Sequence, residues 1–119
     1  MAKILVIEDN EQNLYLVTFL LEKHGHGVIQ ARSGEQGIAA AAIASPDLIL
    51  LDIQLPDLDG YAVAETLRRT ASTAPIVAVT SYAMSGDRER ALAAGCRGYI
   101  EKPIDPATFL GAVMVHLGR

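Results

Sequence analysis

Short apolar runs alternate with segments of helical periodicity along the whole chain. Each run is almost continuously apolar, which is typical of strands that are buried on both faces of a sheet. The expected strands are KILVI (3–7), VIQA (28–31), LILL (48–51), IVAVT (76–80) and the beginning of GYIEKP (98–103). A helical segment follows each of them, so that five strands and five helices alternate.

Capping residues and apolar stripes mark the helices. Apolar residues recur at helical spacing over 13–25, and the helix is expected to end at Gly25. SGEQ (33–36) has the Ser-x-x-Gln form of a capping box, which opens an alanine-rich helix to about Ala44. Asp105-Pro106 suits the N-cap and first position of the closing helix. The remaining expectations are a third helix with Val63, Ala64 and Leu67 on one face, a fourth ending near Gly95, and a closing stripe of Phe109, Leu110, Val113, Met114 and Leu117.

This alternation predicts an α/β fold with a doubly wound parallel sheet. Right-handed crossovers between parallel strands place helices on both faces of the sheet. We expect five strands in the flavodoxin-like order 2-1-3-4-5, a (βα)5 arrangement. In such open sheets, function lies beyond the carboxyl ends of the strands, so the last residue of each strand is the place to look.

Composition narrows the class of protein. With 119 residues the chain fits one domain, 1–119, and half of its residues are hydrophobic, which predicts a compact globule. A formal charge of −4 without a basic run argues against direct nucleic-acid binding. The single cysteine, Cys96, is expected to be a small half-buried residue in a reducing compartment. There is no signal-peptide pattern and no membrane-spanning run, since the longest candidate, IAAAAIA (38–44), is too short. We expect a cytoplasmic monomer.

Polar and charged residues gather where the strands end. Glu8 and Asp9 follow the first strand, Asp52 the third, and Lys102 the fifth, while Thr80 ends the fourth. Three carboxylates at one edge would repel one another and raise at least one pKa, unless a cation neutralises them. Mg²⁺ is the expected ion, because it binds one or two carboxylates, keeps several waters and accepts a phosphate oxygen.

Asp52 is then a candidate nucleophile. An ionised carboxylate can attack a phosphoryl group and form an aspartyl phosphate. The transition state spreads negative charge over three equatorial oxygens. Mg²⁺ can stabilise one of these oxygens, the Lys102 ammonium a second, and the Thr80 hydroxyl together with backbone N–H groups the third.

With these residues the sequence resembles the receiver domains of two-component response regulators, the CheY-like superfamily. The resemblance covers essentially the whole chain. The sequence of its motifs is most similar to that of stand-alone receivers of the DivK kind and of the receivers of hybrid kinases. Glu8 stands where many members of the family carry Asp. The motifs that carry it are VIEDN (6–10), PDLILLDIQLPDLDG (46–60), VAVTSYAMSGD (79–87) and GYIEKPID (98–105).

The resemblance implies a role for each residue of the set. It makes Asp52 the phosphoacceptor, Thr80 the switch hydroxyl, Tyr99 the switch aromatic and Lys102 the phosphate-contacting amine. It also implies a cis bond before Pro103, as in many members of the family. The implied metal ligands are Glu8, Asp9, Asp52 and the backbone carbonyl of Gln54, and the implied phosphate-contacting N–H groups are those of Ile53 and Ser81. Gln54 and Tyr82 would flank the path of water to the phosphoryl group.

The function that follows is signalling. A histidine kinase or phosphotransferase would phosphorylate Asp52, and a change in protein–protein contacts would reach a downstream target. The chain would catalyse its own phosphorylation and slow dephosphorylation without being a turnover enzyme. Three points stay open: whether the chain is stand-alone or a receiver excised from a hybrid kinase, whether the phosphorylated form dimerises, and which proteins are its partners.

The same residues also allow other interpretations. An aspartyl-phosphate phosphatase would carry a second Asp as general acid and base at the position of Gln54, and an amide cannot shuttle a proton. A flavin binder would need hydroxyls and glycine after the first strand, and LPDLDG lacks the ligands of a calcium loop. Taken singly, Asp9 could cap the first helix, Tyr99 could be half-buried packing and Lys102 a surface lysine. His24, His26 and His116 show no ligand spacing, and we expect them to face solvent.

Overall fold

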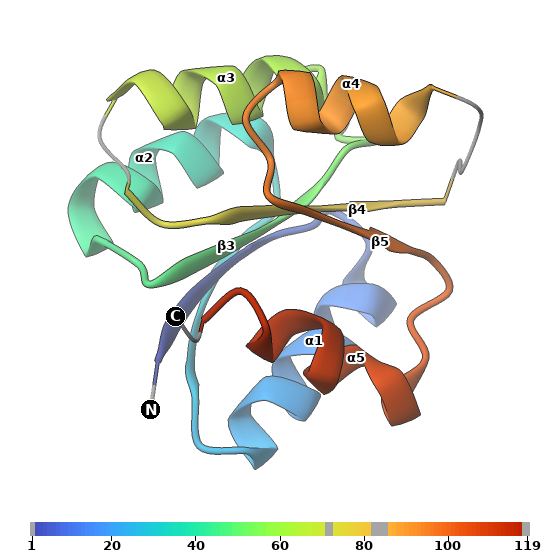
Figure 1. Ribbon diagram of the computed structural model, residues 1–119. Coiled ribbons are helices and arrows are strands. Elements are labelled where there is room, and N and C mark those ends of the chain that lie inside the picture. Colours follow the sequence, from blue (N-terminus) through green and yellow to red (C-terminus); the bar gives the residue numbers. More distant parts are fainter. Residues whose placement is uncertain (1, 71–72, 82–85, 118–119) are drawn as a thin grey trace.

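The computed structural model describes residues 2–70, 73–81 and 86–117. Within them, five strands form one parallel sheet with five helices around it (Figure 1). The strands are β1 (Lys3–Ile7), β2 (Gly27–Ala31), β3 (Leu48–Asp52), β4 (Ile76–Thr80) and β5 (Gly98–Glu101). The helices are α1 (Glu11–Lys23), α2 (Gly34–Ala44), α3 (Gly60–Thr70), α4 (Asp87–Ala93) and α5 (Pro106–Met114).

The strand order is β2-β1-β3-β4-β5, which confirms the predicted doubly wound sheet. The register brings the strand ends level with one another: Ile7 lies beside Leu51, Asp52 beside Val79, and Thr80 beside Glu101. As a result, the residues at or just after the carboxyl ends of β1, β3, β4 and β5 meet at a single edge of the sheet.

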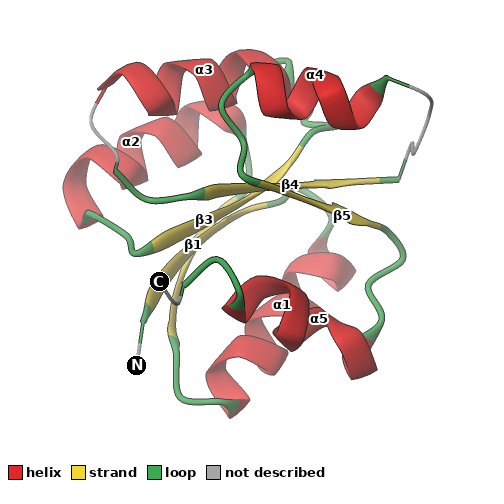
Figure 2. Ribbon diagram, viewed as in Figure 1, coloured by secondary structure: helices red, strands yellow, loops and turns green. Residues whose placement is uncertain are grey.

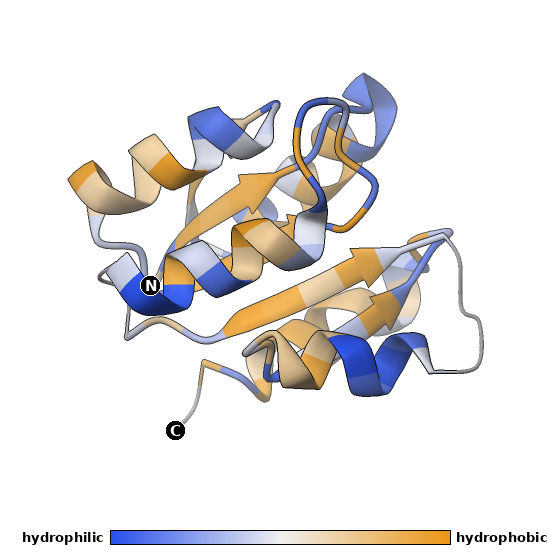
Figure 3. Cartoon of the chain, turned by 90° about the horizontal axis from the view of Figure 1, so that it is seen from above, coloured by the Kyte–Doolittle hydropathy of each residue, from blue (hydrophilic) through white to orange (hydrophobic). Residues whose placement is uncertain are grey.

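Two layers of helices cover the sheet. Helices α1 and α5 lie on one face and α2, α3 and α4 on the other (Figures 1 and 2). Alternate residues of each strand point to opposite faces. In β1, Leu5 and Ile7 pack beneath α2 and α3, and Ile4 and Val6 pack against α1 and α5. The apolar strands seen between the helices in Figure 3 therefore serve two cores at once.

Helix caps follow the sequence signals with one correction. The Ser33 hydroxyl accepts a hydrogen bond from the Gln36 N–H, and Asp105 accepts one from Ala107 N–H at the start of α5. The interpretation of Asp9 as the cap of α1 is wrong. Asn10 is the N-cap, and its side chain accepts a hydrogen bond from the Asn13 N–H at 2.9 Å. Asp9 is exposed, and it precedes the capping residue.

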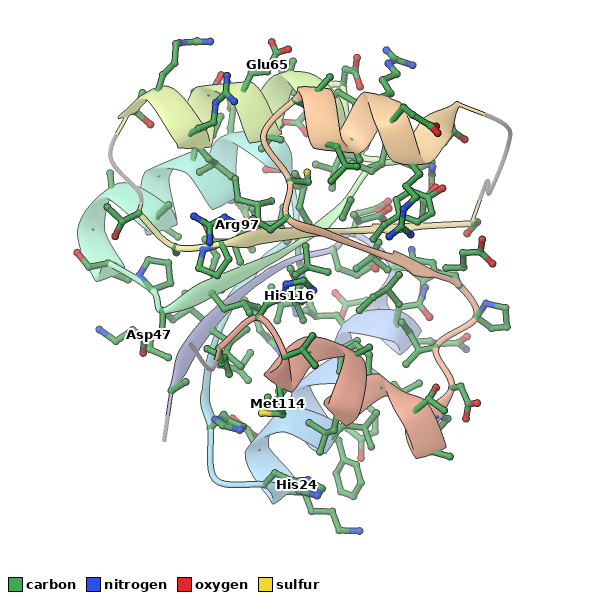
Figure 4. The ribbon with its side chains drawn as sticks, in the orientation of Figure 1. His24, Asp47, Glu65, Arg97, Met114 and His116 are labelled. Atoms are coloured by element: carbon green, nitrogen blue, oxygen red, sulfur yellow. The ribbon has the colours of Figure 1, made fainter. Side chains whose placement is uncertain are left out.

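The expectation that all three histidines face solvent is wrong for two of them. His24 is exposed, but His26 and His116 are half-buried. His26 Nδ1 accepts a hydrogen bond from the Ala2 N–H at 3.1 Å. The His116 ring lies against Gly98, where a side chain on the glycine would collide with it (Figure 4). His116 is half-buried because the chain beyond α5 packs back onto β5, and His26 because its ring pairs with the backbone before β1.

The length and polarity of the helices bear on membrane association. None of the helices in the described part of the chain is long and apolar enough to cross a bilayer.

Candidate functional site

Three polar residues are buried at the carboxyl edge of the sheet. Their exposed fractions are 4% for Glu8, 2% for Asp52 and 1% for Thr80. Burying carboxylates is unfavourable unless they are paired or solvated by other polar groups. The position is set by the strands, because the apolar stretches of β1 and β3 end immediately before these carboxylates. Asp47 before β3 and Arg97 before β5 lie at the opposite edge of the sheet, where these strands begin (Figure 4).

Lys102 reaches the buried carboxylates from the far side of β4. Its Nζ lies 3.0 Å from Glu8 Oε1 and 3.3 Å from Asp52 Oδ2. The backbone places it there: Lys102 N–H donates to the Thr80 carbonyl at 2.8 Å, and the Lys102–Pro103 bond is cis, as expected. The alternative view of Lys102 as an ordinary surface lysine is wrong, because only 10% of its side chain is exposed.

The crowding of charges shifts two pKa values. Burial, and next the neighbouring Glu8, raise the pKa of the Asp52 carboxyl to about 6, against the opposing effects of the Gln54 N–H and Lys102. Burial alone would lower the pKa of the Lys102 ammonium, but the two carboxylates outweigh it and raise that pKa. Asp52 therefore still ionises near neutral pH, and Lys102 stays protonated, which is the state required of a nucleophile and its cationic neighbour.

The acidic residues fit a divalent cation. One carboxylate oxygen from each of Glu8, Asp9 and Asp52 lies within 4.8 Å of the others. Three ionised carboxylates and the single Lys102 ammonium leave two uncompensated negative charges, and oxygen ligands of this kind suit hard divalent ions. Asp9 is exposed whereas the other two acids are buried, so that an ion could enter from solvent on the Asp9 side.

Gln54 connects the acceptor strand with β4, which sequence reasoning did not foresee. Its backbone N–H donates to Asp52 Oδ1 at 2.9 Å. Its side-chain Nε2 donates to Thr80 Oγ1 at 2.6 Å, and its Oε1 accepts from the Ser81 N–H at 3.2 Å. The sequence carried a weak signal, because Gln54 follows Asp52 by two residues, just beyond the end of β3, which pairs with β4.

The remaining predicted site residues lie nearby. Tyr99 is half-buried on β5 beside Ala78 and packs against the core under α2, α3 and α4. The Ile53 N–H donates to the Val79 carbonyl at 3.0 Å, so a contact with a phosphoryl group would require that bond to open. The roles of these residues and of the Gln54 carbonyl stay predictions. Tyr82 lies outside the described residues.

With the fold and this edge of the sheet established, the chain can be compared with known proteins. The response regulator receiver domain matches residues 4–114. The chain belongs to this family of two-component signalling proteins. The polar-differentiation response regulator DivK of Brucella ovis is 40% identical over 117 residues, which make up 97% of this chain and 95% of that protein.

Solved structures show the same similarity. A CheY-like receiver domain protein from Methanospirillum hungatei superposes with a TM-score of 0.92 and 29% identity, covering 98% of this chain and 94% of that one. The receiver domain of the sensor histidine kinase PA1611 from Pseudomonas aeruginosa gives a TM-score of 0.90 and 33% identity, covering 99% and 98%. That structure has a magnesium ion coordinated in its active-site cleft. These similarities favour a receiver over the phosphatase and flavin-binding alternatives, and a receiver works with a phosphodonor and a downstream protein.

Proposed function

We infer that Asp52 accepts a phosphoryl group and that the resulting charge is the signal. The observation that carries this inference is the buried Asp52 carboxylate 3.3 Å from the Lys102 ammonium at the carboxyl edge of the sheet. A carboxylate oxygen of Asp52 attacks the phosphorus of a phosphohistidine, and the phosphorus–nitrogen bond breaks. The electron pair stays on the imidazole nitrogen, and the product is an aspartyl phosphate.

Lys102 serves the reaction as a fixed cation. Its ammonium is already held between Glu8 and Asp52, so little reorganisation is needed when negative charge develops on the phosphoryl oxygens. The Thr80 hydroxyl and the N–H groups of Ile53 and Ser81 would supply further donors on the β4 side once the bonds of these N–H groups to the Val79 carbonyl and to Gln54 open. Lys102 carries no proton to the leaving group in this scheme.

The carboxylates of Glu8, Asp9 and Asp52 and the Gln54 carbonyl would hold Mg²⁺, whose charge would offset the negative charge of the phosphoryl oxygens and of the acidic residues. The magnesium in the cleft of the PA1611 receiver supports this choice of ion. The chemistry of the donor set, three carboxylates at one edge, supports it independently.

The biological setting is a cytoplasmic phosphorelay. A histidine kinase or histidine phosphotransferase donates the phosphoryl group, and a downstream protein reads the change. The chain does not turn over a substrate. Gln54 stands where a phosphatase of the Asp-x-Asp kind has its general acid and base, and its side-chain amide contacts Thr80 and Ser81 instead.

The test is covalent labelling by acetyl phosphate in the presence of Mg²⁺, followed by intact-mass spectrometry. We expect one phosphoryl group per chain on the unmodified protein and none on Asp52→Asn. Asp105→Asn is a matched control, because Asp105 is an exposed acid at the start of α5, and it should be labelled normally. Labelling of Asp52→Asn at the normal level would reject Asp52 as the acceptor. Sustained hydrolysis of a generic phosphate ester would support the phosphatase instead.

A further inference from the structure

The Gln54 side chain stands between the phosphoacceptor strand and the switch hydroxyl. Through its backbone N–H it holds Asp52 Oδ1, and through its side chain it holds Thr80 Oγ1 and the Ser81 N–H. One half-buried residue therefore contacts three of the groups that take part in the proposed phosphorylation.

The orientation of the Gln54 amide follows from its partners. A backbone N–H can only donate, so the Ser81 N–H requires the amide oxygen on its side. The NH₂ group then faces Thr80, whose hydroxyl oxygen can accept. The reverse orientation would place two donors against each other at Ser81. The amide is thus held by two hydrogen bonds that both depend on β4.

A phosphoryl group on Asp52 would need the same partners. Its oxygens are acceptors, and the donors proposed for them on this side are the Ser81 N–H and the Thr80 hydroxyl. In the structure the Ser81 N–H is already used by Gln54 Oε1, and the Thr80 oxygen is held at 2.6 Å by Gln54 Nε2. The Gln54 amide and the phosphoryl group therefore compete directly for the Ser81 N–H. At Thr80 they use different atoms, because Gln54 donates to the hydroxyl oxygen whereas the phosphoryl group would accept from the O–H, so the bond from Gln54 opposes the movement of Thr80.

We propose that the Gln54 side chain is a latch that holds Thr80 and Ser81 in their unphosphorylated arrangement and must release both before the phosphoryl group is bound. The proposal rests on the function proposed for Asp52. Gln54 is a positioning residue, since its side chain makes and breaks no covalent bond. Release replaces two neutral hydrogen bonds by charge-assisted ones to the phosphoryl oxygens, so the latch slows phosphorylation without preventing it.

The test compares Gln54→Met with the unmodified protein. Methionine is unbranched and of similar length, so it keeps bulk beside the acceptor while removing both side-chain hydrogen bonds. We expect the initial rate of labelling by acetyl phosphate with Mg²⁺ to rise by at least about three- to tenfold, the effect of one net hydrogen bond, since two are removed. Gln12→Met, at an exposed glutamine of α1, is the matched control and should leave the rate unchanged.

Two further measurements separate a latch from a general structural effect. The concentration of beryllofluoride, a phosphoryl mimic, that gives half-saturation should fall by a similar factor in Gln54→Met. The Ser81 amide proton should shift in the NMR spectrum of the unphosphorylated variant, because its hydrogen bond to Gln54 is lost. Gln54→Ala, which removes the bulk as well, should be labelled at least as fast as Gln54→Met, so the conclusion does not depend on one variant folding well.

The outcomes distinguish this proposal from the function on which it rests. If the unmodified protein and the Gln54 variants are labelled equally fast, or the variants more slowly, the latch is wrong while Asp52 remains the acceptor. If none of them is labelled above the level of Asp52→Asn, the proposed function fails and the latch with it.

Discussion

The Lys102 ammonium lies 3.3 Å from Asp52 Oδ2, although their strands, β5 and β3, are separated by β4. The lysine stem bridges that separation at the carboxyl edge of the sheet. The contact places a fixed positive charge beside a carboxylate that would otherwise be buried next to Glu8 with no compensating cation from the described part of the chain. Pairing does not remove the whole cost of burial, because the pKa of Asp52 is still raised to about 6.

This residual cost predicts how stability depends on pH without metal. The pKa of Asp52 is about 6 in the folded protein against 3.8 ordinarily, so between these values the folded state binds more protons than the unfolded state. The stabilisation from this group is fully present below the unfolded value and is lost as pH rises through about 6. Asp52→Asn cannot titrate, so at pH 7.5 it should be more stable than the unmodified protein by about 1–2 kcal/mol, allowing for screening.

Chemical denaturation in EDTA across this pH range measures the difference. The advantage of Asp52→Asn should shrink towards acid pH. Added Mg²⁺ should stabilise the unmodified protein more than the variant, because the variant lacks one of the proposed ligands. An advantage that stays constant from acid to neutral pH would show that Asp52 titrates normally.

Asp9 provides the clearest test of the metal site. Since Asn10, and not Asp9, caps α1, Asp9→Asn should leave the free energy of unfolding in EDTA unchanged. It should nevertheless weaken Mg²⁺ binding by about 10-fold or more, because a charged ligand is replaced by a neutral one. Isothermal titration calorimetry measures the affinity, and Glu65→Gln on the outer face of α3 is the control (Figure 4). Equal affinities for Asp9→Asn and the unmodified protein would remove Asp9 from the ligand set.

The grouping of the site residues at one edge of the sheet could be predicted from the sequence for a simple physical reason. Parallel strands place their carboxyl ends together, so Glu8, Asp52 and Lys102 could be brought to one place once the strands were recognised. The lysine stem was also long enough for the distance. Side-chain rotamers, and the competition between neighbouring residues for the same role, could not be predicted in this way. Asn10 outcompetes Asp9 as the cap of α1, and the Gln54 amide turns towards β4, and neither choice follows from spacing along the chain.

The start of α2 depends on a residue of the loop before α3. Asp57 accepts hydrogen bonds from the N–H groups of Gly34 at 2.8 Å and Glu35 at 3.1 Å. These bonds, that from Gly34 first, lower the pKa of Asp57. The contact therefore stabilises the fold above the ordinary pKa of the carboxyl and is lost as pH falls through its lowered value.

Asp57→Ala should lower the melting temperature at neutral pH by a few degrees, because the first two N–H groups of α2 lose their acceptor. The difference from the unmodified protein should narrow as the pH is lowered. Differential scanning calorimetry checks both statements. Asp47→Ala is not a suitable control, because Asp47 accepts the Lys3 N–H, whereas Glu65→Ala is exposed and should melt normally. A difference that does not depend on pH would mean that the Asp57 charge contributes nothing.

Cys96 is more deeply buried than its sequence context suggested, with 4% of its surface exposed. Burial raises the pKa of its thiol to about 11. The thiolate is the reactive form of cysteine. The rate at which Cys96 reacts with a disulfide reagent should therefore be lower by about 100-fold or more in the folded protein than in denaturant. Stopped-flow absorbance at pH 7.5 measures both rates. Rapid reaction of the folded protein would show that the loop after α4 opens readily.

Output from the site should pass through Thr80 and Tyr99. A phosphoryl group adds negative charge and acceptor oxygens beside Thr80, whose hydroxyl is a movable donor. If Thr80 moves towards it, the half-buried Tyr99 ring on the neighbouring strand can turn into the space left behind. This scheme requires both arrangements to exist in equilibrium, so that phosphorylation shifts their populations only by its stronger interaction with one of them.

The surface that changes is expected to include α4, β5 and α5. The Arg90 guanidinium lies 4.2 Å from the centre of the Tyr61 ring and 3.5 Å from Asp59, which ties α4 to the α3 side of the molecule. Arg88 on the same helix is exposed, and no ion pair is recorded for it among the described residues. Arg88 is thus a candidate contact for a partner, whereas Arg90 has a structural role.

Two substitutions test whether output passes through Thr80 and the surface of α4, one at the switch and one at the surface. Thr80→Ala should still accept a phosphoryl group but lose most of the phosphorylation-dependent gain in affinity for the downstream protein, since the charge at Asp52 no longer moves the switch. Arg88→Glu should change partner affinity and leave phosphorylation intact, because its side chain lies on the surface of α4, away from the buried acids. Fluorescence anisotropy with the downstream target, and not with the kinase, measures the gain. A full gain in Thr80→Ala, or protection from hydrogen exchange by the target on α1 and not on α4 and β5, would place the output elsewhere.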